Sequence, residues 1–389
     1  MRGAAAGALG ALLAACSSAA PAPPTTAATG TSAPSTARPP VPPPSAAAPL
    51  PPAPPADVPP GLTAEAMTSG VPPDLSAIPA ADLRVLVVTG DVIPARLVNL
   101  ALRRLGDYGR PFRAVAPLLA QGDLRLVDLE APLIAACPVV TTGFTFCGDA
   151  RVADGMAAAG VSVASLANNH ATNHGADGIA QTEALLDAHG IAWTLPGHIA
   201  VREVRGVRFA VLGVNLVGAH FDEPAVRAEI ARARTAADVV VVEYHWGREY
   251  ETFPMAAAGI APDDPKVVGR ATIDDGADLV IGNHPHCVQG AELHHGHLIA
   301  YAHGNLLFDQ HWSTGTQESV IGRYVFAGTR LVAVQYLPVR IGGDVEPRPL
   351  DPSAGEGRAI LDRMLRSMRE LARVSAPRMN GPGIDDACP

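Results

Sequence analysis

The most informative pattern along the chain is a series of short, continuous apolar runs that each end in polar residues. The runs have the length of β-strands and lack polar alternation, which is typical of strands buried on both faces. They cover residues 84–89, 124–129, 161–167, 238–244 and 279–282. The sequence therefore predicts a buried, largely parallel sheet or pair of sheets.

Stretches with helical spacing of apolar residues lie between these runs. Residues 151–159, 176–189 and 266–275 each end near a glycine, the residue that most often closes a helix. The alternation of strands and helices predicts an α/β fold with helices packed on the sheets. A further amphipathic helix is expected at residues 355–374, with arginines opposite its apolar face.

Residues 17–80 differ in composition from the rest of the chain. This segment is rich in Pro, Ala, Ser and Thr. It cannot bury enough apolar surface to offset the entropy lost on folding, so we expect an extended linker. The remainder is expected to divide into an α/β domain at 81–350 and a C-terminal amphipathic helix and tail at 351–389.

The first sixteen residues resemble an export signal. Arg2 is followed by an apolar stretch that is too short to span a bilayer stably. Its end, Leu13-Ala14-Ala15-Cys16, resembles the lipobox of bacterial lipoproteins, in which the cysteine is lipidated and becomes the N-terminus. We expect an exported protein anchored in the cell membrane through Cys16, outside the cytoplasm. An ordinary cleaved signal with a chance cysteine is the alternative.

The charge pattern excludes several classes of function. The net charge is -9 and no basic stripe is present, so we expect no nucleic-acid partner. The only lysine, Lys266, lies in no Gly-rich loop, which excludes a GxxxxGK[ST] phosphate-binding loop. No GxSxG motif is present either, so a serine nucleophile has little support.

Four cysteines follow Cys16. Disulfides persist outside the cytoplasm, and Cys137 and Cys147 flank a short polar segment that can close as a hairpin. We therefore expect a bridge between these two residues. Cys287 lies inside a histidine motif, where it could be a small buried apolar residue, and its pairing with Cys388 cannot be judged from the sequence.

The polar residues that follow the apolar runs are of the types that bind metal ions. In α/β sheets the loops at the carboxyl ends of the strands meet at one edge, where ligands bind. Carboxylate, amide and imidazole side chains suit Mn, Fe, Zn or Mg, and a carboxylate shared by two cations would make a two-metal site. The residues concerned are Asp91, Glu130, Asn169, His170, His245, His284 and His286. A polar network inside a structural sheet is the alternative.

The histidines are unevenly distributed, since all 13 lie between His170 and His311. A single histidine is more often a structural residue than a metal ligand. Several at consecutive strand ends favour a metal site. We assign no role to the cluster of His294, His295 and His297, although a short His-rich tract can bind metal adventitiously.

Six motifs in a fixed order resemble the CapA family, which is associated with poly-γ-glutamate capsule synthesis and placed in the calcineurin-like metallophosphoesterase superfamily. They are residues 90–96 (GDVIPAR), 128–130 (DLE), 167–170 (ANNH), 245–250 (HWGREY), 282–286 (GNHPH) and 304–310 (GNLLFDQ). The resemblance runs from about residue 84 to about residue 350. It implies a β-sandwich of mixed sheets flanked by helices, in four αββα layers.

The resemblance also implies ligands for one or two divalent metal ions. Asp91 would bind a metal ion, Glu130 would bridge two ions, and Asn169 would supply an amide oxygen. The superfamily has a histidine where this chain has Ile93, and an aspartate where it has Glu130. One metal position is therefore expected to be weak or empty.

Histidines would complete the two metal positions that the resemblance implies. His245 and His284 would fill the shell of one ion, and His286 would bind the other.

Further residues would contact the substrate. His170 would stabilise or protonate a leaving oxygen. Arg96 and Arg248 would hold an anionic substrate, with ordinary surface or ion-paired arginines as the alternative. The chain also departs from the usual family motifs at Asp128, which could point into the sheet, and at His303, which could be a pocket residue or a local substitution.

Two functions from different classes are compatible with these residues. The first is a metal-dependent hydrolase that cleaves a phosphoester, or less readily an amide, of an anionic envelope polymer or its precursor. The second is a non-catalytic, lipid-anchored subunit that binds the polymer or contacts a membrane-bound synthase. The missing histidine at position 93 favours the second function.

Overall fold

The structure is a computed structural model that describes residues 58–343 and 345–375. The expected export signal, the anchor at Cys16, most of the linker, Cys388 and the C-terminal tail lie outside the described residues.

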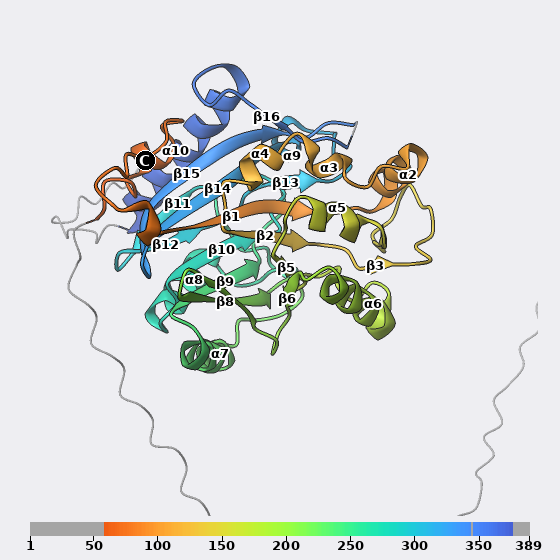
Figure 1. Cartoon of the computed structure of the whole chain (residues 1–389), viewed down its shortest axis with the longest axis horizontal. Coiled ribbons are helices and arrows are strands. Elements are labelled where there is room, and N and C mark those ends of the chain that lie inside the picture. The colour runs from red at the N-terminus through yellow and green to blue at the C-terminus, as the bar shows by residue number, and fades with distance from the viewer. Residues whose placement is uncertain (1–57, 344, 376–389) are drawn as a thin grey trace, which may run out of the picture. The chain divides into compact units, whose positions relative to one another are not determined.

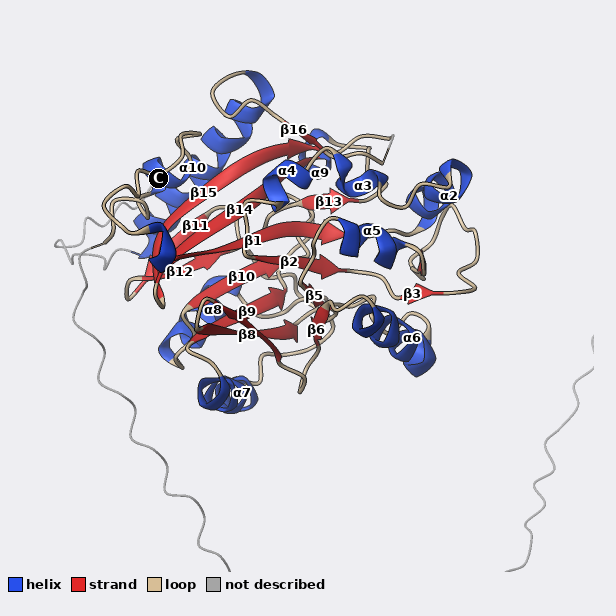
Figure 2. Ribbon diagram, in the orientation of Figure 1, coloured by secondary structure: helices blue, strands red, loops and turns tan. Residues whose placement is uncertain are grey.

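The folded unit is built around two mixed sheets (Figures 1 and 2). In spatial order the first sheet consists of β16 (Arg348–Pro349), β15 (Arg330–Arg340), β14 (Glu318–Ala327), β1 (Leu83–Val92), β2 (Leu124–Leu129), β5 (Val163–Ser165) and β6 (Ala192–Thr194), while β13 (Asn305–Leu307) pairs with β1. The strands β1, β2, β5 and β6 are parallel, and β14, β15 and β16 are antiparallel.

The second sheet has parallel strands at its centre and antiparallel strands at both edges. Its spatial order is β11 (Ala291–His294), β12 (His297–Ala300), β10 (Leu279–Asn283), β9 (Val239–His245), β8 (Val207–Asn215) and β7 (Ala200–Val204). The strands β12, β10, β9 and β8 are parallel, whereas β11 and β7 are antiparallel to their neighbours. A separate ribbon pairs β3 (Leu133–Ile134) with β4 (Gly148–Asp149).

Helices cover the outer faces of the sheets (Figure 2). Those packed on the first sheet follow its parallel strands: α2 (Arg96–Leu105), α3 (Arg110–Arg113), α4 (Ala116–Leu119), α5 (Val152–Ala158) and α6 (Gly175–Ala188). The second sheet carries α7 (Glu223–Ala236) and α8 (Pro265–Asp274). The remaining helices are α1 (Ala64–Met67), η1 (Ala80–Asp82), α9 (Thr314–Gln317) and α10 (Gly355–Ser375).

The central strands are continuously apolar because each lies between two of the three large hydrophobic cores of the fold. Val88 of β1 and Val241 of β9 belong to one core that lies between the sheets. Their neighbours Val87 and Val240 belong to two different outer cores, against the helices. Since successive side chains of a strand point to opposite faces, a strand with a core on both sides has no polar face. The predicted α/β class with mixed sheets flanked by helices is confirmed.

The predicted central strands and helices are present, with bounds within a few residues of those expected. Each of the three helices is followed by its expected glycine in the left-handed conformation, Gly160 (φ 75°), Gly190 (φ 70°) and Gly276 (φ 105°). An L-residue is strained at such φ values and glycine is not, so these glycines mark helix ends reliably.

The folded unit begins earlier than the composition suggests. Gly61 forms an isolated bridge with Ala333 of β15, and Leu62 and Met67 are buried in the core between the sheets. These two apolar side chains provide the buried surface that holds this part of the segment on the folded unit. The end of the expected linker therefore packs on the α/β unit, and the expected boundary at residue 81 is too late for residues 61–67.

The C-terminal amphipathic helix closes the core between the sheets. Ile360, Leu361, Met364 and Met368 of α10 belong to that core, and Leu371 belongs to the core on the outer side of the second sheet. Within residues 58–343 and 345–375, none of the helices has the length and apolar character needed to cross a membrane.

The expected disulfide between Cys137 and Cys147 is present, and it joins the two ends of the segment between β3 and β4. Cys287 is free and buried among the described residues. The expectation of a small buried residue at this position is confirmed.

Asp149 at the end of β4 is expected to contribute stability that is lost in acid. Two hydrogen bonds from Arg151, of 2.9 and 2.8 Å, outweigh partial burial and lower the pKa of Asp149 from 3.8 to about 2. The contribution is complete above pH 3.8 and disappears as the pH falls through 2. We expect Asp149→Asn to lower the free energy of unfolding by about 1 kcal/mol at pH 7 and by much less at pH 2. Denaturant unfolding at both pH values measures this, and an equal loss at both would contradict the ion pair.

Candidate metal centre

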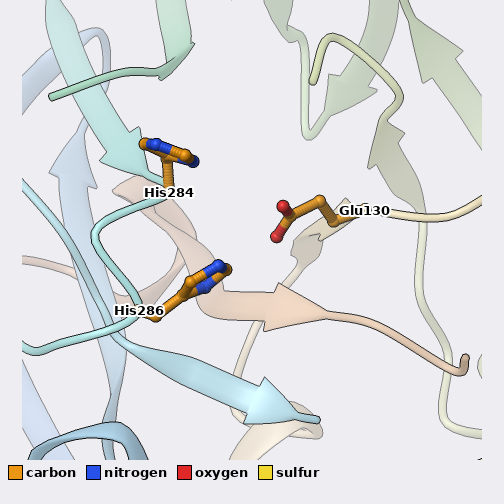
Figure 3. Close-up of side chains that lie close together, drawn as sticks. All are labelled: Glu130, His284 and His286. Atoms are coloured by element: carbon orange, nitrogen blue, oxygen red, sulfur yellow. The ribbon is translucent and has the colours of Figure 1, made fainter. Parts of the chain in front are cut away.

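The carboxyl ends of strands from both sheets bring a set of acidic and imidazole side chains together. Asp91 lies near the end of β1, and Glu130 follows β2 directly. From the second sheet, His245 is the last residue of β9, and His284 and His286 follow β10. All five side chains are buried. In Figure 3 the carboxylate of Glu130 points toward the two histidines that follow β10.

Two glycines allow the backbone to approach closely around this centre. A Cβ atom on Gly90 would lie 1.9 Å from the carbonyl oxygen of Gly304, to which the amide of Asp91 donates a hydrogen bond of 3.0 Å. A Cβ on Gly282 would lie 2.2 Å from Trp246 Nε1. The glycines of the GDVIPAR and GNHPH motifs are therefore required by packing.

The backbone of the ligand loop after β10 is unusual. His284 and His286 have φ values of 93° and 55°, in the region that L-residues seldom adopt. Such conformations persist only where the surrounding structure enforces them, and they cluster at functional sites. With this backbone conformation, both imidazoles lie toward the carboxylate of Glu130 (Figure 3).

The potential ligands form two groups that share one residue. Ligand atoms of Asp91, Asp128, Glu130 and His245 lie within 4.8 Å of one another, and so do those of Glu130, His284 and His286. Glu130 belongs to both groups. A carboxylate with two oxygens between two sets of ligands is the arrangement that a two-metal site requires.

Asp128 holds His245 in one orientation. The Oδ2 atom of Asp128 lies 2.9 Å from His245 Nδ1, and its Oδ1 atom accepts a hydrogen bond of 3.0 Å from Asn168 Nδ2. Because the carboxylate accepts from Nδ1–H, Nε2 is the ring nitrogen of His245 that faces the centre, with Glu130 Oε1 at 3.3 Å. Despite burial, the carboxylates of Glu130 and Asp128 raise the pKa of His245 well above its usual value. A carboxylate behind a histidine is a common way to orient a metal ligand.

His284 and His286 also contact other members of the two ligand groups. His286 Nδ1 lies 2.8 Å from Asp91 Oδ2, and His284 Nδ1 lies 3.1 Å from His245 Nε2. The backbone amide of His284 also approaches Asp91 Oδ1 at 3.5 Å. These contacts connect the two ligand groups across the sheets.

Several buried polar atoms of the centre have no hydrogen-bond partner. They are both carboxylate oxygens of Glu130, Asn169 Oδ1 and His284 Nε2. An unpartnered buried polar atom costs about 1–3 kcal/mol, so native proteins contain few of them. All four atoms carry lone pairs suited to a cation. The donor set therefore fits divalent metal ions.

The electrostatics of the centre are consistent with that fit. Burial raises the pKa of Glu130 to about 7, despite the opposing effect of His245. Burial and the neighbouring histidines lower the pKa of His284 well below its usual value, so its ring is neutral and able to act as a ligand. For His286 the carboxylates of Glu130 and Asp91 outweigh burial and raise the pKa to about 9. A bound cation would supply the positive charge that protons on Glu130 and His286 supply in its absence.

Two sequence expectations can be compared with this geometry. Ligand atoms of His284 group with those of Glu130 and His286, while His284 Nδ1 also lies 3.1 Å from His245 Nε2, so the expected sharing of one ion by His245 and His284 stays a prediction. Asp128, for which pointing into the sheet was one alternative, faces His245 and belongs to a ligand group. Asn169 is the expected amide ligand, and its buried, unpartnered oxygen suits that role.

His170 lies at the side of the centre. Its Nε2 atom is 3.8 Å from Glu130 Oε1, and its Nδ1 atom is 2.9 Å from Asn173 Oδ1. The ring stacks on Phe146 with centroids 4.1 Å apart. Burial lowers the pKa of His170 to about 4. This placement is compatible with contact to a group bound in front of Glu130.

Arg96 is an ion-paired arginine. It forms a two-pronged ion pair with Asp309 and a hydrogen bond of 3.2 Å with the carbonyl of Gly143. Its guanidinium lies 5.0 and 4.8 Å from the ring centroids of Phe146 and Phe308. These contacts support the ion-paired alternative over a substrate-binding role.

Arg248 is more accessible, with 55% of its side chain exposed and Glu251 at 3.5 Å. It lines a surface cavity of about 550 Å³ together with Tyr250, whose ring centroid is 6.2 Å from that of His286. A larger cavity of about 700 Å³ lies between residues 58–78 and β15 and contains none of the candidate ligands. The smaller cavity is therefore the better candidate for substrate contact.

Comparison with known proteins gives a consistent result. The family of bacterial capsule synthesis proteins PGA_cap matches residues 85–310. The chain is 28% identical over 302 residues to the capsule biosynthesis protein CapA of Bacillus anthracis, covering 70% of this chain and 71% of that protein. It is 30% identical over 226 residues to the PGA biosynthesis protein CapA of Bacillus subtilis (strain 168), covering 53% of this chain and 57% of that protein.

Solved structures align less closely. A hypothetical protein from Thermus thermophilus aligns with a TM-score of 0.46 at 19% identity, covering 66% of this chain and all of that chain. A novel phosphatase from Mycoplasma pneumoniae aligns with a TM-score of 0.44 at 11% identity, covering 66% of this chain and 94% of that chain. The sequence matches, and not these alignments, carry the family relationship.

Proposed function

Since the chain belongs to the bacterial capsule synthesis protein family PGA_cap, we propose that it is a metal-dependent hydrolase in the synthesis of a capsule or other envelope polymer. Poly-γ-glutamate is the polymer that the PGA name of the Bacillus subtilis relative suggests. The observation that carries the proposal is Glu130, which is shared by two ligand groups and has both oxygens buried without a hydrogen-bond partner.

The chain offers ligands for both metal positions of the proposed reaction. The first ion would be held by Asp91, Glu130 and His245, and the second by Glu130 with His284 and His286. Divalent ions in such a site activate water and polarise a phosphoryl or carbonyl oxygen. The proposed bond is a phosphoester, with an amide as the second possibility.

His170 and Arg248 are proposed to contact the substrate. His170 Nδ1 donates its proton to Asn173 Oδ1, so the neutral ring presents a lone pair at Nε2, 3.8 Å from Glu130 Oε1, where it can accept a hydrogen bond from a water or hydroxyl group bound in front of the centre. Arg248 can pair with an anionic group that enters the adjacent cavity.

We expect Arg248→Ala to raise KM roughly fivefold while kcat changes little, because an exposed ion pair to the substrate contributes about 1 kcal/mol of binding. Steady-state kinetics with an anionic substrate measure both constants. Arg208→Ala is the matched control, since Arg208 is an exposed arginine at the start of β8, paired with Asp238. An unchanged KM in Arg248→Ala would contradict the substrate contact.

The proposed activity is tested with the full-length chain, stripped with a chelator and reloaded separately with Mn²⁺, Zn²⁺ or Mg²⁺. Hydrolysis is measured on a generic phosphodiester and on poly-γ-glutamate. We expect turnover with at least one ion and none in the chelated protein. Absence of turnover from every metal-loaded form on both substrates would contradict the hydrolase.

A non-catalytic role is the second candidate, and one observation favours it. Ile93, at the position where the superfamily has a histidine, is fully buried in an apolar cluster with Phe146 and Phe308, so it supplies no ligand. The chain would then bind an anionic polymer or a membrane-bound synthase subunit. Binding of poly-γ-glutamate by a metal-loaded protein without any hydrolysis would support this role.

The proposed location is the outer face of the cell membrane, with a lipid anchor on Cys16. The lipobox residues 13–16 and the Pro-rich segment after them support this proposal. Mass spectrometry of the protein isolated from membranes would detect a diacylated N-terminal cysteine. An unmodified N-terminus at another position would contradict the anchor.

A further inference from the structure

A second group of potential metal ligands lies at the turn between β11 and β12. Ligand atoms of Asp274, His294 and His295 lie within 4.8 Å of one another. The turn is next to the start of β10, because the first residues of β12 pair with Leu279. Since the centre at Glu130 lies at the opposite ends of these parallel strands, the two groups are separate.

The turn places the side chains of His294 and His295 close together, although the two residues are adjacent in the chain. Successive residues of a strand normally point to opposite faces of the sheet. Here β11 ends at His294, while His295 and Gly296 have φ values of 51° and 84°. This left-handed turn places the two imidazole centroids 4.1 Å apart. Both rings therefore face the same side of the hairpin.

Asp274 completes the group from a different element. Its Oδ1 atom lies 2.8 Å from His294 Nε2 and 3.5 Å from His295 Nε2. Among the described residues, Asp274 forms ion pairs with these two histidines and with no arginine or lysine. It is also the last residue of α8, where the helix dipole favours a positive charge. The electrostatics of this position therefore favour a positive charge, which a bound divalent ion would supply.

We propose that Asp274, His294 and His295 form a second, surface site for a borderline divalent ion such as Zn²⁺. Two imidazoles and one carboxylate are a typical zinc ligand set, with further positions left for water or a donor from another molecule. The side chains of Asp274 and His295 are each 54% exposed, so this ion exchanges more readily than one held at Glu130. His297 is not a member, because its Nδ1 atom bonds to the carbonyl of Asp278 at 3.1 Å.

The test is Zn²⁺ and Cu²⁺ binding to the full-length chain after chelator treatment. Calorimetry measures the number and affinity of Zn²⁺ ions, and electron paramagnetic resonance of bound Cu²⁺ reports nitrogen ligands. We expect His294→Ala/His295→Ala to lose one weakly held Zn²⁺ ion, with affinity reduced at least tenfold, together with the corresponding Cu²⁺ nitrogen signal. His297→Ala is the matched control, since it removes a histidine from the same hairpin and leaves the three ligands.

The outcomes separate this site from the centre at Glu130. The double variant is expected to keep the tightly bound metal and any turnover of the wild-type chain. Equal Zn²⁺ binding by the double variant and the wild type would overturn the proposal. An equal loss in His297→Ala would overturn it too, because that result indicates an unspecific His-rich tract. Neither result bears on the hydrolase, which depends on different residues.

Discussion

Replacing Glu130 by alanine is expected to abolish metal-dependent turnover, lowering kcat on the order of 10³-fold or more. Glu130 is the one residue that the two ligand groups have in common, so its loss removes a ligand from both metal positions at once. Elemental analysis of the purified variant should show loss of the tightly bound metal. Turnover is measured on the substrate that the wild-type chain hydrolyses best.

The control for Glu130→Ala must remove a carboxylate without affecting a ligand. Glu370→Ala is suitable, because Glu370 lies on α10 and forms an exposed ion pair with Arg373. This variant should keep metal and activity. Circular dichroism checks that both variants are folded. If Glu130→Ala kept its metal content and more than half of the turnover, the shared-carboxylate arrangement would be wrong.

The central strands can be predicted from the sequence because they are buried on both faces. Val87 and Val88 of β1 belong to different cores. Both faces of the strand are therefore apolar, and the sequence shows a continuous apolar run that is distinct from the pattern of a helix or a loop. The long antiparallel strands β14 and β15 are not identified in this way. They contain polar residues such as Arg323 and Gln335 and end in no cluster of metal-binding side chains, so neither hydrophobic runs nor chemistry marks them.

The members of the metal centre are predictable, whereas their grouping is not. Strand-end position alone selects Asp91, Glu130 and His284. Asp128 and His245, however, meet across two different sheets, β2 in the first and β9 in the second. Contacts between facing sheets depend on how the sheets are rotated against each other, and the sequence pattern of a strand contains no information on that rotation. The sequence alone therefore leaves the direction of the Asp128 side chain open, with a side chain that points into the sheet as one alternative.

Asp128→Asn is expected to weaken binding of the first ion by 10- to 100-fold and to lower turnover at limiting metal by a similar factor. Both oxygens of Asp128 act as acceptors, one for Asn168 Nδ2 and one for His245 Nδ1. An asparagine can accept at one of these positions only. Either the bond to Asn168 is lost, or His245 must change its tautomer and present Nε2–H, in place of a lone pair, to the cation.

Metal titration of turnover distinguishes this positioning effect from loss of a ligand. In Asp128→Asn, excess Mn²⁺ should restore most of kcat, because His245 can still bind the ion at a cost in affinity. In Glu130→Ala, excess Mn²⁺ should not restore it. Asn168→Ala is the matched control, since it removes the bond to Oδ1 and leaves the bond between Asp128 and His245. If Asn168→Ala lost as much metal affinity as Asp128→Asn, the orientation of His245 would not be the property that Asp128 controls.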